Sequence, residues 1–226
     1  MEEKIIISLG GSLIVPEELD INFLRDFKKL ILSQVEQGKK FIIITGGGTL
    51  NRKYNQAAKD LSNPEMEDLD WIGIASLRLN AELMRVIFED KSHGKVINNL
   101  AEPFSFDRPI VIGAAYEPGK STDWDAVLAA KYIGAKKIIN LSNIDYVYDK
   151  DPRVNADAKQ IENISWSEYR KIIPAEWTSR LSSPFDPIAS KMAEEEGIEA
   201  VIMNGKPISN LENYLTGKQF QGTRIK

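Results

Sequence analysis

Residues 5–14 read IIISLGGSLI, and this stretch decides the fold. A nearly continuous apolar run, rich in β-branched residues, is typical of a strand buried on both faces of a sheet. Residues 41–48, FIIITGGG, repeat the arrangement of strand followed by glycines. Each unit then leads into a helical stretch. Two such units in succession predict parallel strands whose carboxyl ends meet at one edge.

The same alternation continues along the chain. The apolar pattern predicts strands at residues 4–9, 41–45, 95–97, 109–113, 136–141 and 199–205, with GTRI (222–225) as an edge strand. It predicts helices over 23–35 (ended by Gly38), from Leu50 onward, over 71–88, from near Asp125, from Asp186-Pro187 and over 207–215. Strands alternating with helices predict an α/β protein, a three-layer αβα sandwich around a mostly parallel sheet. No linker or repeat divides the chain, so we expect a single domain over residues 1–226.

Composition excludes several classes of protein. The 226 residues carry a net charge of −4 and no long basic cluster, which argues against a nucleic acid polymer as partner. The absence of cysteine excludes disulfides, zinc-thiolate sites and thiol nucleophiles. His93, the only histidine, lies in the polar stretch EDKSHGK and reads as a surface residue, which disfavours Ser-His-Asp chemistry. With no signal peptide and no membrane-length apolar run, we expect a soluble, cytoplasmic protein that does not bind a membrane.

The two glycine turns, GGS at 10–12 and GGG at 46–48, suggest a phosphate site. Backbone N–H groups at the carboxyl end of a strand can converge on phosphate oxygens where no side chain intervenes. One such turn alone is more often only a turn, whereas two at matching positions favour a ligand. Neither turn is a Walker A loop, and neither reads GxGxxG.

Acidic and basic residues cluster in the later loops. Aspartates occur in STDWDA (Asp123 and Asp125), in IDYVYDKDP (Asp145, Asp149 and Asp151) and at Asp186. Turn and N-cap roles can explain most of them. Lys191, five residues after Asp186, would then lie near the glycine turns, where a lysine can neutralise a phosphoryl group in transfer. Arg52 is either a solvated surface charge or a fork for an acceptor phosphate.

Taken in order, seven motifs span nearly the whole chain. They are LGGSL, TGGG with NRKYN, DWIGI with RLN, EPGKSTDWDA, NLSNIDYVYDKDP, FDPIASK and GKQFQGTRI. The ordered set resembles the amino acid kinase superfamily and, within it, the uridylate (UMP) kinases of the archaeal type and their bacterial relatives. The resemblance implies an αβα fold, transfer of the ATP γ-phosphoryl group to UMP with Mg²⁺ in pyrimidine nucleotide biosynthesis, and a homohexamer.

The resemblance also implies roles for individual residues. The catalytic group would be Lys191 as charge stabiliser, Asp123 as organiser, and Gly10, Gly11 and Ser12 along the transferring phosphates. UMP would be bound by Gly47, Gly48, Arg52, Asp70 and Thr122. ATP would be bound by Gly11, Ser12, Asn143, Tyr148, Asp151 and Asp186, with Mg²⁺ held mainly by phosphates. The acceptor side would lie mainly in residues 1–115 and the ATP side mainly in residues 116–226.

The sequence departs from the family pattern at two places. Many members carry a lysine where this chain has Ser8, so a positive charge has to come from elsewhere, with Lys120 and Arg52 as candidates. STDWDA leaves two candidates for the organising aspartate; Asp123 is favoured because it follows a threonine. Trp124 either packs in the core or stacks near a ligand. Two other functions stay open: a kinase of the same superfamily with another small acceptor, or a non-catalytic nucleotide or oxyanion binder for sensing or storage.

Overall fold

A computed structural model of the protein describes residues 3–175 and 183–226. Its centre is a seven-stranded sheet with the order β3-β2-β1-β4-β8-β9-β7. The strands of this sheet are β1 Lys4–Leu9, β2 Lys40–Thr45, β3 Ile110–Gly113, β4 Lys137–Ser142, β7 Asn163–Ile164, β8 Glu199–Asn204 and β9 Thr223–Ile225. A separate pair consists of β5 Val147–Tyr148 and β6 Gln160–Ile161.

Eight α-helices and one 3₁₀ turn are described around these strands. They are α1 Gly11–Ile14, α2 Ile21–Glu36, α3 Gly48–Leu61, α4 Met66–Ile87, η1 Glu89–Lys91, α5 Thr122–Ile133, α6 Trp166–Ile172, α7 Pro187–Glu195 and α8 Ile208–Leu215. In the described part of the chain, no helix is both long and apolar enough to cross a bilayer.

The sheet is mostly parallel, as predicted. β1 pairs in parallel with β2 on one side and with β4 on the other, and β3 and β8 extend the parallel set. β9 runs antiparallel to β8 and parallel to β7. The carboxyl ends of β1, β2, β3, β4 and β8 therefore lie along one edge, and the loops that follow them meet there.

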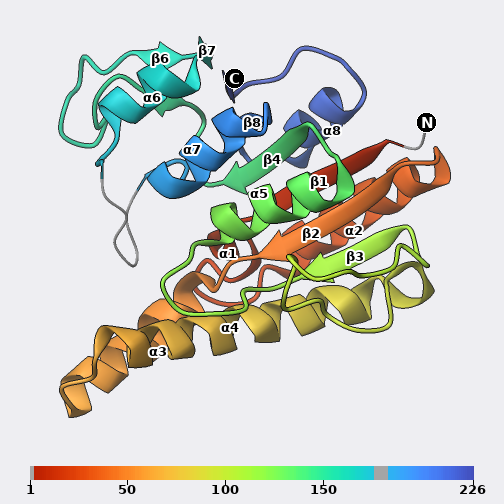
Figure 1. Cartoon of the computed structure of the whole chain (residues 1–226), viewed down its shortest axis with the longest axis horizontal. Helices are drawn as coiled ribbons and strands as arrows, with labels where there is room; N and C mark the ends of the chain where they lie inside the picture. The colour runs from red at the N-terminus through yellow and green to blue at the C-terminus, as the bar shows by residue number, and fades with distance from the viewer. Residues whose placement is uncertain (1–2, 176–182) are drawn as a thin grey trace.

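Helices cover both faces of the sheet (Figure 1). Because side chains alternate along a strand, Ile5 and Ile7 point to one face and Ile6 to the other. The first face packs against apolar residues of α2, α4 and α8, and the second against α5, α6 and α7. These two cores confirm the predicted three-layer αβα sandwich.

Some element boundaries differ from the prediction, and one strand is wrong. Residues 95–97 form no strand: within this segment only Ile97 bridges to β3, and the other bridge, at Ser92, lies before the bend at Gly94. GTRI does form β9, but β7 pairs on its outer side, so β9 is not the edge. The helix expected over 71–88 begins earlier because Glu65 and Asp68 form a capping box.

Candidate active site

The two glycine turns pack directly on each other. The N–H of Gly46 donates to the carbonyl of Leu9 at 2.9 Å, which ties the turn after β2 to the end of β1. A Cβ on Gly11 would lie 2.1 Å from the nitrogen of Gly48, and one on Gly48, whose φ is +63°, would meet the carbonyl oxygen of Gly11. Packing of chain against chain thus requires these glycines whether or not a ligand binds. Ser12 follows within α1 and is partly buried.

Asp123 lies at the centre of a hydrogen-bond network beside these turns. One carboxylate oxygen, Oδ1, accepts from the side-chain amide of Asn140 at 2.8 Å, and Oδ2 accepts from the backbone N–H of Asp186 at 3.0 Å. The hydroxyl of Ser8 donates to the same carboxylate. Ser8 and Asn140 are register partners on β1 and β4, and strand alternation points both toward the face that α5 covers.

Two helix N-termini bring the acidic residues of the network together. Ser121 is the N-cap of α5 and accepts from the N–H of Trp124 at 3.1 Å, so Thr122 and Asp123 fall in the first turn of that helix. The helix thus begins three residues before the predicted start near Asp125. Asp186 caps α7, as predicted, by accepting from the N–H of Ala189 at 2.7 Å.

The carboxylates of this network are poorly compensated. Burial raises the pKa of Asp123 to about 7; the negative charge of Asp186 adds to the increase, while the hydrogen bonds from Asp186, Asn140 and Ser8 oppose it. Burial also raises the pKa of Asp186, against hydrogen bonds from Ala189 and Ser121 and the positive charge of Lys120. A site of this kind is ready to receive a cation or a hydrogen-bond donor near Asp123.

Asp125 lies apart from this network. Its side chain is only 2% exposed, and its Oδ2 atom has no hydrogen-bond partner among the described residues. Burial raises its pKa to about 8, with further contributions from the negative charges of Glu117 and Asp123. Of the two aspartates, Asp123 is therefore the one that makes the hydrogen bonds of the network, and it is also the one that the sequence favoured as organiser.

Trp124 is partly buried and packs against the core beneath α5. The ammonium of Lys120 lies 4.7 Å from the centroid of its ring, within the range of a cation–π contact. Trp124 thus packs in the core, which is one of the two roles expected for it, and its ring also contacts the ammonium of Lys120.

Of the predicted acceptor residues, Asp70 contacts the loop after β3, residues 114–121, and Thr122 directly follows it. Gly47, Gly48 and Arg52 lie instead at the start of α3 and within it. Asp70 on α4 accepts from the N–H of Gly119 at 3.0 Å. Arg78, about two turns further along α4, donates to the carbonyls of Ala115 and Tyr116. Gly47 is tightly packed, since a Cβ there would lie 2.6 Å from the hydroxyl of Ser76. Arg78 thus holds this loop against α4.

Two predicted cations are exposed. Arg52 lies on α3 and hydrogen-bonds the side chain of Thr49 through its guanidinium. Lys191 lies on α7 and has no hydrogen-bond or ion-pair partner within residues 3–175 and 183–226. An exposed lysine that no acidic residue of this part of the chain engages keeps its three donors for a ligand.

The predicted ATP-side residues lie in the loop after β4. Asn143 is exposed, and Tyr148 sits on β5 opposite Gln160. The carboxylate of Asp151 makes a two-pronged ion pair with Arg153, whose Nη2 is 2.8 Å from Oδ2, and the pKa of Asp151 is lowered by these bonds. The structure does not bring Asp151 into the Asp123 network.

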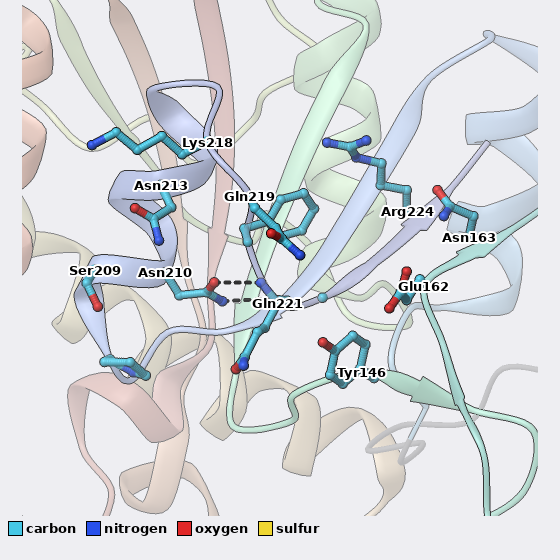
Figure 2. Close-up of a pocket in the computed structure, with 13 residues that line it drawn as sticks. Tyr146, Glu162, Asn163, Ser209, Asn210, Asn213, Lys218, Gln219, Gln221 and Arg224 are labelled. Atoms are coloured by element: carbon cyan, nitrogen blue, oxygen red, sulfur yellow. Dashed lines mark hydrogen bonds between the residues drawn. The ribbon is translucent and has the colours of Figure 1, made fainter.

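A pocket of about 670 Å³ lies between α8 and the segment 218–224, with Tyr146, just before β5, also in its wall (Figure 2). Its lining is mostly polar, with Asn210 joined to the backbone of Gln221 by two hydrogen bonds. None of the predicted site residues lines it. We therefore place the candidate site at the Asp123 network and not at this pocket.

Sequence reasoning missed Asn140 and Ser121 as members of the network. A signal for Asn140 exists, because it is a polar side chain inside the otherwise apolar strand KIINL, two residues before the strand ends. Within the described residues, no group of three or more acidic or histidine side chains is arranged to hold a metal ion.

Comparisons with known proteins agree with this geometry. The model of the amino acid kinase family matches residues 3–204. The uridylate kinase of Sulfurisphaera tokodaii is 32% identical over 219 residues, which cover 95% of this chain and 96% of the relative. The uridylate kinase of Methanobrevibacter smithii is also 32% identical, with 98% of each chain covered.

Solved structures show the same relationship. The crystal structure of uridylate kinase from Archaeoglobus fulgidus superposes with a TM-score of 0.82 at 32% identity, covering 99% of this chain and 100% of that one. The UMP kinase of Bacillus anthracis, at 21% identity and a TM-score of 0.80, shows that the fold is shared. A family model that matches residues 3–204, together with relatives that align over nearly their whole length, places this protein in the amino acid kinase family.

Proposed function

We propose that this protein is a uridylate kinase, an ATP-dependent phosphotransferase that converts UMP and ATP to UDP and ADP in pyrimidine nucleotide biosynthesis. The observation that carries the proposal is the end-to-end similarity to archaeal uridylate kinases at about one third identity. The carboxylate network next to two stacked glycine turns supports it, because phosphoryl transfer requires positioning and charge rather than a histidine or cysteine nucleophile.

The proposed roles follow the sequence assignments. Gly10, Gly11 and Ser12 line the phosphates in transfer, Asp123 organises the centre, and Lys191 approaches the transferred group from α7. Gly47, Gly48 and Arg52 bind the UMP phosphate, while Asp70 contacts the ribose and Thr122 lies beside the acceptor. The hydrogen bond from Gly119 to Asp70 supports placing Asp70 and Thr122 at one acceptor site, because it draws the loop after β3 toward α4.

The ATP side is proposed on the loops after β4 and before α7, within residues 116–226, with the acceptor side mainly in residues 1–115. The nucleoside would be held by Asn143, Tyr148 and Asp151. Asp186 would fix the start of α7 beside the phosphates. Asp151 has to exchange its ion pair with Arg153 for a contact to ATP. This exchange costs little, because both side chains are exposed to solvent.

Mg²⁺ is part of the proposal as the ion that accompanies ATP. Its ligands would be phosphate oxygens, since no cluster of three or more candidate side chains exists in the described residues. The donor set beside the glycine turns fits such an ion, because the Asp123 and Asp186 carboxylates are adjacent and neither forms an ion pair within the described residues. When bound, Mg²⁺ neutralises charge on the phosphates. A homohexamer and a cytoplasmic location are further proposals that rest on the resemblance and on composition.

The decisive experiment is ADP release from ATP and Mg²⁺ by the purified protein, with a separate assay for each of seven acceptors. They are UMP, CMP, dUMP, AMP, glutamate, carbamate and isopentenyl phosphate. We expect strong turnover with UMP. Turnover with glutamate, carbamate or isopentenyl phosphate in place of UMP would identify another kinase of the superfamily. Binding of ATP without turnover on any acceptor would identify a sensing or storage protein.

The same assay tests the assignment of Lys191. Removal of one donor to a developing negative charge typically costs a factor of about 10²–10³ in kcat. We expect Lys191→Ala to lose about that much, with little change in the KM of either nucleotide. Lys218→Ala, which removes a lysine from the remote pocket between α8 and residues 218–224, is the matched control and should behave like wild type. A Lys191→Ala enzyme with normal kcat would contradict the assignment.

A further inference from the structure

The charges around the start of α5 do not balance. Three carboxylates are buried or partly buried there, those of Asp123, Asp125 and Asp186. The negative charge of Glu117 further raises the pKa of Asp125. The hydrogen-bond partners of Asp123 are neutral groups of Ser8, Asn140 and Asp186. Incoming phosphates bring negative charge beside these carboxylates, so a cation held there would stabilise both the phosphates and the ionised form of the carboxylates.

Lys120 is placed to supply that cation. Its charge lowers the pKa of Asp125 and of Asp186, against the dominant effect of burial, so its ammonium lies within electrostatic reach of both carboxylates. It is also the residue immediately before Ser121, the N-cap of α5. Lys120 therefore lies at the end of the loop after β3, within electrostatic reach of Asp186 at the start of α7. In the proposed function, the two substrates meet at this place.

The backbone on both sides of Lys120 is held. Gly119 donates to Asp70 on α4, and Ser121 is fixed by its cap to the N–H of Trp124. The side chain is held as well, because the ammonium rests over the ring of Trp124, itself packed against the core. Such preorganisation reduces the entropy that a long, exposed lysine otherwise loses on meeting a ligand.

We infer that Lys120 is a further catalytic residue: held over Trp124, its ammonium contacts the phosphoryl group during transfer and offsets the carboxylates around α5. The inference rests on the proposed function. In the transfer, the bond from the γ-phosphorus to the β,γ-bridging oxygen of ATP breaks as a bond forms from that phosphorus to a phosphate oxygen of UMP. The products are ADP and UDP. The attacking oxygen is already anionic, so no base is needed and Lys120 keeps its proton throughout.

The test compares kcat and KM for ATP and UMP in four variants. Lys120→Met removes the charge but keeps the stem on the ring, and we expect kcat to fall about 100-fold with each KM within about threefold. Lys120→Arg keeps both the charge and the stacking and should retain most of the activity. Trp124→Leu removes the platform and should give an intermediate kcat. Lys59→Met, at an exposed lysine on α3, should match wild type.

The outcomes separate this inference from the proposed function. If wild type releases ADP with UMP and Lys120→Met has the same kcat, the inference is overturned while the proposed function stands. A rise in KM at unchanged kcat would also overturn it, because the lysine would then act only on the bound ground state. If wild type releases no ADP with any acceptor, the proposed function fails and the inference fails with it.

Discussion

Asp123 is buried, and burial is the main influence on its ionisation, because its hydrogen-bond donors carry no formal positive charge and only partly oppose the effect. Its pKa is raised by burial from 3.8 to about 7 in the folded protein. Between these two values the folded chain binds more protons than the unfolded chain. The free energy of unfolding therefore falls as the pH rises from about 4 to about 7, and this contribution of Asp123 is fully lost above that range.

Asp123→Asn should remove this dependence, because the amide keeps the shape of the side chain and does not ionise. We expect the free energy of unfolding, from urea denaturation at several pH values between about 4 and 8, to fall less steeply for the variant than for wild type. Asp26→Asn, at an exposed position on α2, is the control and should keep the wild-type slope. An unchanged slope in Asp123→Asn would show that Asp123 ionises normally.

The residues of the site could be predicted only in part. Asp123 and Asp186 stand out because they open helices, and an aspartate before a helical pattern is visible in sequence. Ser8 and Asn140 are instead fixed by the pairing of β1 with β4, which joins positions more than 130 residues apart. No local pattern encodes which strand lies next to which, so the partners of Asp123 required the structure.

At the scale of elements, the two glycine turns are in close backbone contact. Gly11→Ala would place a Cβ 2.1 Å from the nitrogen of Gly48 and 2.5 Å from the carbonyl oxygen of Gly46. Both neighbours are backbone atoms in turns that close two strands, so the turns have to separate. We expect the free energy of unfolding to fall by about 1–3 kcal/mol, the usual cost of overpacking, as measured by urea denaturation.

Gly94→Ala is the matched control, since a Cβ at Gly94 has no atom within 4 Å. We expect it to change the stability by about 0.5 kcal/mol or less. Equal stability of Gly11→Ala and wild type would show that the turns can move apart freely. In that case the glycines at the site would be required by a ligand and not by chain packing.

Element types followed from periodicity, whereas boundaries and short strands did not. The apolar residues of α2 recur at helical spacing and belong to one core, so the helix was predicted with its correct face. The start of α4 depends on a capping box at Glu65, outside the apolar pattern. The segment 95–97 is apolar enough for a strand, but it meets β3 by a single bridge at Ile97.

At the scale of the whole molecule, the outer side of α4 exposes large apolar side chains. Trp71, Leu79 and Val86 are exposed by 46%, 62% and 57%, and their spacing puts them on one side of α4. Figure 1 shows α4 along one margin of the molecule, with α3 beside it. An apolar stripe on an outer helix is typical of an interface, and we expect it to join copies of this chain.

Sedimentation velocity tests both the oligomer and the surface that builds it. We expect wild type to sediment as a homohexamer of the 25.4 kDa chain, and Leu79→Glu/Val86→Glu to sediment as a smaller species because charge in a buried apolar interface is costly. Leu61→Glu, at a residue 87% exposed at the end of α3, is the control and should leave the assembly intact. A monomeric wild type would refute the hexamer. A hexamer that persists in the double variant would move the interface to another surface, because two glutamates per subunit cannot be buried together without their charges repelling.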